Sequence, residues 1–372
     1  MTEKRIKLGV PDYRFLAAVG ILLLFGLLML TSASSPTAIS RYGDAYYFLQ
    51  RQLAVGLTPG LIGFAFFYFF DYKKIRRFAL PLFSVSVFLL AVVLIPGIGQ
   101  IYGGARRWIG LAGITFQPSE LAKLGLIVYL ASWFAAKQQK LGSLREGFLP
   151  FIVLLGTVLG LIVLEPDLGT TMVIAIATVV LYFLSGAPLR HFFLLLVAGV
   201  AAVGGLIALA PYRFNRLLIF LKPELDPQGI GYHINQAFLA IGSGGFWGRG
   251  YGHSQAKFQY LPEASGDSIF AVIGEELGFL LSVAFIGLLV YVFIRGFKIA
   301  EHSPDDFGRY LGAGIMLWLL VQSIINIGAM LGLLPLTGLP LPFVSYGGTA
   351  LAVSMAAIGI VANISRQSTV EV

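Results

Sequence analysis

Ten long apolar stretches follow one another along the chain, and this feature restricts the possible folds most. They cover residues 13–33, 50–70, 78–97, 118–136, 148–164, 169–185, 192–210, 268–295, 307–330 and 347–365. A helix needs about 20 mainly apolar residues to cross a bilayer. Of the 372 residues 57% are hydrophobic and 12% are charged, against about 25% charged in soluble domains. The sequence therefore excludes a soluble enzyme and predicts an all-α polytopic membrane protein: ten transmembrane helices in a single integral-membrane domain, 1–372.

The positions of the basic residues predict the orientation of these helices. Lys and Arg accumulate in the cytoplasmic loops of membrane proteins. A cytoplasmic N-terminus places 16 of the 26 basic residues on the cytoplasmic side: Lys4, Arg5, Lys7, Arg14, Lys73, Lys74, Arg76, Arg77, Lys137, Lys140, Arg145, Arg190, Arg295, Lys298, Arg309 and Arg366. An even number of spans returns the C-terminus to the same side. This bias also accounts for the formal net charge of +8, so no nucleic-acid partner is expected.

The longest polar segment, residues 211–267, connects the seventh and eighth predicted helices and is expected on the extracytoplasmic side. Phe214, Leu217, Leu218 and Leu221 are spaced i, i+3, i+4, i+7, which places them on one face of a helix. Basic residues lie off that stripe. The pattern predicts a short amphipathic helix that lies on the outer membrane surface.

A first motif, GARRWIGLAGITFQPSELAKL at 104–124, combines a helix start with two ionisable residues. Pro118 suits the first turn of a helix, where its missing N–H would have no partner. Glu120 and Lys123 then lie three residues apart on one helical face. Ionisable residues inside a span usually face a polar cavity or one another. The pair therefore either lines a substrate cavity or forms a structural ion pair, and the sequence leaves both open.

A second motif, LEPDLGTT at 164–171, ends the fifth apolar stretch. Glu165 and Asp167 are candidate acids, bases or metal ligands. Pro166 and Gly169 break helices. The residue types favour a tight turn between two helices.

Glycines dominate a third motif, AIGSGGFWGRGYG at 240–252, without the spacing of a nucleotide-binding loop. A flexible turn back towards the membrane is the favoured interpretation, with Arg249 and the backbone amides free to contact an anion.

A fourth motif, YLPEASGDSIFAVIGEELGF at 260–279, carries three acidic candidates around the start of the eighth predicted helix. Asp267 lies at the N-terminal end of this helix, where it could cap the helix or act as a general base at a cavity at the membrane surface. Glu275 and Glu276 lie about 12 Å deeper. They need partners or water, and they belong either to the structure or to an ion path.

A fifth motif, LLPLTGLPLPFVSYGGTA at 333–350, is rich in proline and glycine and predicts a broken re-entrant stretch that is packed against protein or a cavity. Cysteine is absent, so disulfides and cysteine nucleophiles are excluded. The four histidines show no metal-binding spacing.

Taken together, these motifs resemble the SEDS family, the FtsW/RodA/SpoVE group of bacterial cell-wall polymerases. The resemblance runs from PDYRF at 11–15 to the last span and includes GARRW, FQPSE, EPDLGT, AIGSGG and PLPFVSYGG. It implies the ten-helix SEDS fold in the bacterial cytoplasmic (inner) membrane. It also implies peptidoglycan glycosyltransfer, in which lipid II is polymerised at the outer face during cell division or elongation.

The resemblance also implies roles for individual residues. The family's catalytic aspartate matches Asp267. The family's Glu–Lys pair and its arginines match the substrate-binding candidates Glu120, Lys123, Arg107, Arg213 and Arg216, and the motif serines Ser243 and Ser345 complete that set.

The sequence departs from the family pattern beside the catalytic position. Many members have Thr before this Asp and Phe after it, whereas this chain has Gly266 and Ser268. The segment GYGHSQAKFQYLPE resembles the division branch, FtsW, and LTGLPLPF resembles the elongation branch, RodA. We favour the division branch.

The expected reaction is an inverting transfer, which needs one general base and cations for the leaving diphosphate. No cofactor is certain, although a divalent cation could assist the diphosphate. Expected partners are lipid II, a class B penicillin-binding transpeptidase and proteins of the division or elongation complex. Two alternatives remain at this stage: a lipid II flippase, and a non-catalytic scaffold for the transpeptidase.

Overall fold

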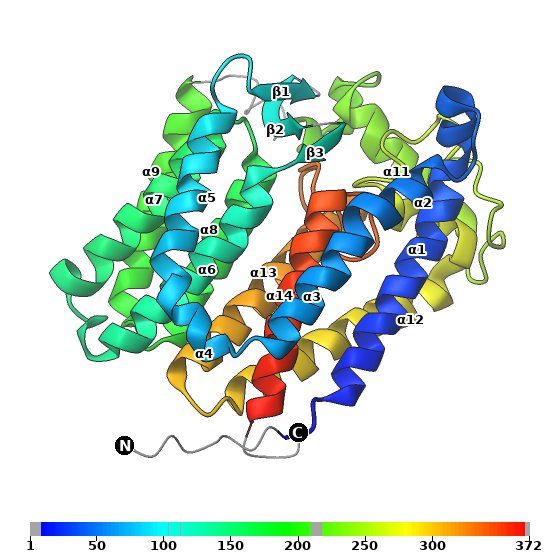
Figure 1. The fold of residues 1–372 in the computed structure, drawn as a ribbon. Helices are drawn as coiled ribbons and strands as arrows, with labels where there is room; N and C mark the ends of the chain where they lie inside the picture. The colour runs from blue at the N-terminus through cyan, green and yellow to red at the C-terminus, as the bar shows by residue number, and fades with distance from the viewer. Residues whose placement is uncertain (1–8, 103, 112, 210–217, 369–372) are drawn as a thin grey trace.

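A computed structural model describes residues 9–102, 104–111, 113–209 and 218–368, and it shows a bundle of long helices with a small sheet at one end (Figure 1). Eight described helical segments are long and apolar enough to cross a membrane: Tyr13–Tyr42, Tyr47–Phe69, Tyr72–Val93, Pro118–Lys140, Leu144–Leu164, Ile269–Glu301, Asp306–Met330 and Gly348–Gln367. Two shorter apolar helices, Leu168–Leu184 and Leu189–Ala202, lie between the fifth and sixth of them.

The individual elements have the following bounds: α1 Tyr13–Tyr42, α2 Tyr47–Arg51, α3 Thr58–Phe69, α4 Tyr72–Ile75, α5 Ala79–Val93, β1 Gly99–Tyr102, β2 Ala105–Leu111, β3 Ile114–Phe116, α6 Pro118–Lys137, α7 Leu149–Leu164, α8 Leu168–Leu184, α9 Leu189–Leu209, α11 Ile230–Gly244, α12 Ile269–Glu301, α13 Asp306–Met330 and α14 Gly348–Gln367. A π-helical stretch, Gln52–Leu57, joins α2 to α3.

Each predicted apolar stretch coincides with a helix, and the largest difference in length is at α1. The stretch predicted at 13–33 continues as a helix to Tyr42. The small residues after Leu30 are buried against the bundle, and Gly43 ends the helix in a left-handed conformation with φ 72°. Tertiary packing therefore extends this helix beyond its apolar run.

The prediction of an all-α fold is wrong for residues 99–102, 105–111 and 114–116, which form a three-stranded antiparallel sheet in the order β1-β2-β3. Ile109 pairs with Phe116 and Gln100 with Trp108. Gly104 and Gly113, both with positive φ, lie in the two turns. Short strands joined by glycine turns are a hairpin signal. The motif GARRWIGLAG carries that signal, but the long apolar stretches on both sides of it favoured a helical interpretation.

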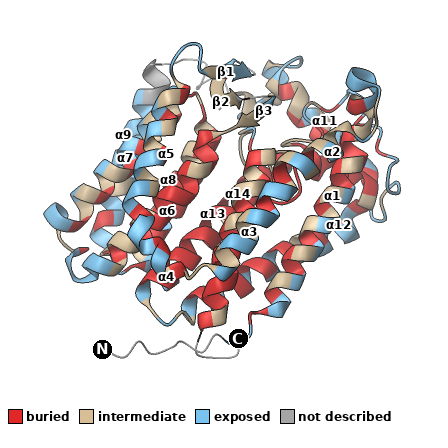
Figure 2. Cartoon of the chain, in the orientation of Figure 1, coloured by how far each residue is buried: buried red, intermediate tan, exposed pale blue. Residues whose placement is uncertain are grey.

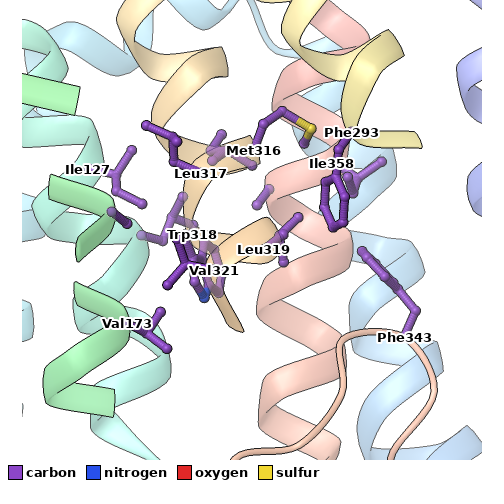
Figure 3. Packing of buried hydrophobic residues seen from close by; sticks show 14 of the residues in the cluster. Ile127, Val173, Phe293, Met316, Leu317, Trp318, Leu319, Val321, Phe343 and Ile358 are labelled. Carbon is purple, nitrogen blue, oxygen red and sulfur yellow. The ribbon is translucent and has the colours of Figure 1, made fainter. Parts of the chain in front are cut away.

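The buried core lies along α6, α13 and α14, whereas α3, α5 and α7 expose much of their surface (Figure 2). On α13, Trp318 lies on the side of Ile127 of α6 and Val173 of α8, and Leu319 lies on the side of Ile358 of α14 (Figure 3). The outer helices expose large apolar side chains such as Phe66, Phe69, Phe193 and Val197. Surfaces of this kind suit contact with lipid.

Both described ends of the chain lie at the end of the bundle opposite the sheet (Figure 1). The Gly9 N–H donates to the carbonyl of Arg366 at 2.7 Å, and the Asp12 N–H donates to Ser365 Oγ at 3.2 Å. Asp12 also forms an ion pair of 2.6 Å with Arg295 of α12. These contacts place the two ends on the same side, as an even number of membrane crossings requires.

The segment 211–267 contains a helix that the sequence analysis did not predict. Helix α11, Ile230–Gly244, buries Ile234, Ala237 and Ala240 and packs against α12. It lies near the sheet end of the bundle (Figure 1). The predicted amphipathic helix, including Phe214 and Leu217, falls mostly on residues 210–217, outside the described residues.

Candidate active site

Asp267 lies in the loop just before α12, and neighbouring elements hold that loop from two sides. The side-chain amide of Asn326, on α13, donates to the Asp267 carbonyl at 2.7 Å. The Tyr346 N–H donates to the carbonyl of Ser265 at 2.8 Å. A Cβ atom on Gly338 would lie 3.9 Å from Asp267 Oδ2. The end of α13 and the 331–347 segment between α13 and α14 therefore fix the position of Asp267.

The Asp267 carboxylate is not the cap of α12. The N-cap residue is Ser268, and no side chain makes a capping hydrogen bond there. Asp267 Oδ1 instead lies 3.3 Å from Ser268 Oγ. The helix-cap interpretation is therefore wrong.

The surroundings of Asp267 favour its protonated form more than water does. Burial, and then repulsion by the Glu263 carboxylate, raise the pKa of Asp267 to about 7, while the hydrogen bond from Ser268 acts in the opposite direction. A carboxylate with a pKa near neutrality is matched to general-base catalysis.

The turn at 165–167 contacts the sheet through Arg107. Asp167 caps α8, accepting from the Thr170 N–H at 3.0 Å. The Arg107 guanidinium of β2 donates to the carbonyls of Glu165 and Pro166 and lies 3.9 Å from Asp167 Oδ2. The interpretation of EPDLG as a turn between helices is confirmed.

Glu165 is the least satisfied acid of this turn. It is fully buried, and neither carboxylate oxygen has a hydrogen-bond partner among the described residues. Burial and then the nearby Asp167 raise its pKa to about 8, against the opposing effect of Arg107.

Glu120 and Lys123 form a buried ion pair of 2.9 Å within the first two turns of α6. Lys123 Nζ also donates to Gln322 Oε1 at 2.8 Å and lies 4.9 Å from the centre of the Trp318 ring. Beside Lys123 there is a cavity of only about 10 Å³, which is smaller than a sugar. These contacts favour the structural interpretation of the pair, and its proposed role in substrate binding stays a prediction.

Gln322 and Asn326, one turn apart on α13, connect this ion pair to Asp267. Gln322 donates to the carbonyl of Pro340 at 2.8 Å. Asn326 donates to the carbonyls of Leu339 and Asp267, both at 2.7 Å. The sequence analysis missed both amides. Two polar side chains four residues apart in an apolar span were the available signal.

Glu275 and Glu276 attach the segment 249–257 to α12. Glu276 forms a fully buried ion pair of 2.8 Å with Lys257. Glu275 accepts from the Ser254 hydroxyl at 2.6 Å and lies 3.3 Å from Arg249. All four ionisable groups are paired, which gives the two acids a structural role.

The remaining candidates are less directly connected to Asp267. Ser243 donates to the Ala240 carbonyl within α11, and Ser345 Oγ accepts from the Leu341 N–H at 2.8 Å in the 331–347 segment. Arg213 and Arg216 lie outside the described residues. The substrate-binding roles of all four stay predictions.

Comparison with known proteins places this arrangement in a family of membrane proteins. The family model FTSW_RODA_SPOVE, described as "Cell cycle protein", matches residues 13–370. The chain therefore belongs to the FtsW/RodA/SpoVE family, and the resemblance seen in the motifs is confirmed.

Individual relatives cover almost the whole chain. It is 42% identical over 366 residues to the probable peptidoglycan glycosyltransferase FtsW of Trichlorobacter lovleyi, covering 98% of this chain and 95% of the relative. It is 39% identical over 368 residues to stage V sporulation protein E of Bacillus subtilis, covering 99% and 100%. A chain of a structure titled "Structural coordination of polymerization and crosslinking by a peptidoglycan synthase complex" superimposes with a TM-score of 0.79 at 30% identity, covering 96% and 98%.

Proposed function

We propose that this protein is a peptidoglycan glycosyltransferase that polymerises lipid II, with Asp267 as the general base. The observation that carries the catalytic assignment is the position of Asp267: a carboxylate at the mouth of α12, not used as a cap, with its pKa raised to about 7. The glycosyltransferase class rests on the family and on the relatives that bear that name.

The general base acts on the sugar hydroxyl that attacks the lipid-linked donor. As the new glycosidic bond forms at the anomeric carbon, the hydroxyl proton passes to the Asp267 carboxylate, and the diphosphate leaves. A positioned base of this kind contributes about 10²–10⁴-fold. Because attack and departure take place in one displacement, no covalent enzyme intermediate is needed.

Cations must stabilise the leaving diphosphate. Arg107 is the described candidate at the sheet end, and its guanidinium is held by the 165–167 turn. Within the described residues no group of three or more His, Asp or Glu side chains could hold a metal ion.

The membrane arrangement forms part of the same proposal. Ten helices cross the cytoplasmic membrane of a bacterium, both termini are cytoplasmic, and the sheet, α11 and Asp267 face outwards. A class B penicillin-binding transpeptidase is the proposed partner. The neighbouring solved complex, whose title joins polymerisation to crosslinking, supports this choice.

The test compares Asp267→Asn with the native chain in a lipid II polymerisation assay in detergent, where no second compartment exists. We expect a loss of at least about 100-fold, because the amide cannot accept the proton. Retained thermal stability and transpeptidase binding would show that the variant is folded. Full polymerisation by Asp267→Asn would contradict the catalytic assignment. Movement of labelled lipid II across liposomes without polymer would favour a flippase.

A further inference from the structure

The hydroxyl of Ser268 is buried beside the carboxylate of Asp267 and lies within hydrogen-bonding distance of three groups. Ser268 Oγ is 2.8 Å from the Pro262 carbonyl oxygen, 2.5 Å from His233 Nε2 and 3.3 Å from Asp267 Oδ1. His233 belongs to α11, so this contact also connects α11 to the start of α12. The inference drawn from this cluster rests on the proposed role of Asp267 as general base.

A count of protons limits how this cluster can be bonded. A serine hydroxyl donates one proton and accepts through its lone pairs, and a carbonyl oxygen only accepts. His233 is neutral near pH 7, since burial lowers its pKa to about 4. A neutral imidazole that carries its proton on Nε2 donates to Ser268 Oγ and leaves the serine proton free for another acceptor.

With His233 in this Nε2–H form, the serine proton has two arrangements, one for each state of the base. When Asp267 is ionised, the Ser268 hydroxyl turns towards Oδ1 and donates to the carboxylate. When Asp267 carries a proton on Oδ1, that proton is donated to Ser268 Oγ, and the serine hydroxyl turns to the Pro262 carbonyl. In both arrangements His233 donates to the same oxygen.

We propose that Ser268, anchored by His233, is a positioning residue that gives Asp267 a hydrogen-bond partner both before and after Asp267 takes the proton from the sugar hydroxyl. During this step the sugar O–H bond breaks and an O–H bond forms on Asp267. Ser268 only reorients its hydroxyl, and His233 keeps its proton.

The other groups around Asp267 determine how strongly the Ser268 hydroxyl affects the ionisation of Asp267. Glu263, in the same loop, opposes ionisation of Asp267, and the Ser268 hydroxyl favours it. His233 is the titratable group that faces the cluster from α11. Asn326 of α13 and Gly338 of the 331–347 segment adjoin Asp267 and are uncharged. Removal of the hydroxyl therefore leaves the repulsion from Glu263 and the effect of burial opposed only by the backbone N–H groups of Asp267 and Ser268.

The experiment measures the pH dependence of lipid II polymerisation by the full chain, with Ser268→Ala and Ser268→Thr. A general base is active when ionised, so activity rises with pH through its pKa. Ser268→Ala is expected to shift this acid limb upwards by roughly half to one pH unit, the size of one hydrogen bond. The loss is then several-fold on the limb and is recovered at alkaline pH. Ser268→Thr, which keeps the hydroxyl, is expected to restore the native limb.

A second pair of variants tests the anchor independently. His233→Gln keeps a side-chain N–H donor near the Nε2 position and is expected to keep the native limb, whereas His233→Phe is expected to shift it as Ser268→Ala does. If Ser268→Ala fails to fold, His233→Gln and His233→Phe test the proposal by themselves. Native acid limbs in both Ser268→Ala and His233→Phe would overturn the proposal. If Asp267→Asn is inactive in that case, the proposed function survives and only this inference fails.

Discussion

At the scale of single residues, neutral hydrogen bonds hold the candidate base in place. The main chain around Asp267 is held by Asn326 and Tyr346, and its side chain contacts Ser268. Such contacts position a carboxylate without adding a cation, which would lower its pKa. Ser268 therefore lies where it affects the base directly.

Asn326→Leu is expected to reduce polymerisation by about tenfold or more. The substitution leaves the buried carbonyls of Asp267 and Leu339 without the amide donor, and each unpaired group carries a cost of about 1–3 kcal/mol. Ser323→Ala is the matched control on α13, because its hydroxyl bonds only within the helix, to Leu319. Equal turnover of the two variants would contradict the positioning role.

Lys123→Met is expected to lower the free energy of unfolding by about 3–5 kcal/mol, because the Glu120 carboxylate would then be buried without its partner. Thermal unfolding in detergent measures the effect. The double variant Lys123→Met with Glu120→Gln removes both charges and is expected to regain most of the loss. A native melting temperature for Lys123→Met alone would rule out a tight structural pair.

At the scale of elements, α12 is interrupted where the glycine-rich segment 245–250 meets it. Gly278 has φ 72° inside the helix. The N–H groups of Arg249 and Gly250 donate to the carbonyls of Glu275 and Glu276. At the kink, the carbonyls of Glu275 and Glu276 therefore accept hydrogen bonds from the 245–250 segment instead of from α12. The two motifs form one structural unit.

Gly278→Ala is expected to destabilise the protein by at least about 1–3 kcal/mol, because its φ is strained for any L side chain and a Cβ there would lie 2.2 Å from the Gly248 nitrogen. Gly287 provides the control in the same helix, since a Cβ at that position meets nothing within 4 Å. Gly287→Ala should leave stability unchanged or raise it slightly. Equal melting temperatures for Gly278→Ala and Gly287→Ala would contradict this prediction.

At the scale of the whole molecule, the helix bundle separates two ends that carry polar groups. One end holds both described chain ends and the ion pair between Asp12 and Arg295. The other holds the sheet and α11 (Figure 1). Helix α6 runs from the sheet end to the opposite end over 20 residues, about 30 Å, which is the thickness of a bilayer core.

Because the chain contains no cysteine, single-cysteine labelling can test the proposed orientation directly. Tyr102→Cys in β1, an exposed position, is expected to react with a membrane-impermeant maleimide in intact spheroplasts. Lys140→Cys, three residues beyond the far end of α6, is expected to react only after lysis. The reverse pattern would place the proposed active site on the cytoplasmic side.

The sequence alone determined the class of protein, the positions of the apolar helices and most motif residues. Hydropathy and spacing are local properties of the chain, and proline, glycine and acidic residues have clear positional preferences. The sheet of β1, β2 and β3 was not predicted, because its short strands and glycine turns lie between long apolar stretches that favour helices.

Only the tertiary structure decided which residues share a site. Glu120 pairs with Lys123, which donates to Gln322, and Asn326 one turn further along α13 donates to the carbonyl of Asp267. These contacts join residues up to 199 positions apart, which no local pattern encodes. The same holds for the role of Ser268, since its third partner, His233, comes from another helix. Hydrogen bonds and burial depend on which helices pack together, and packing follows from the whole chain at once.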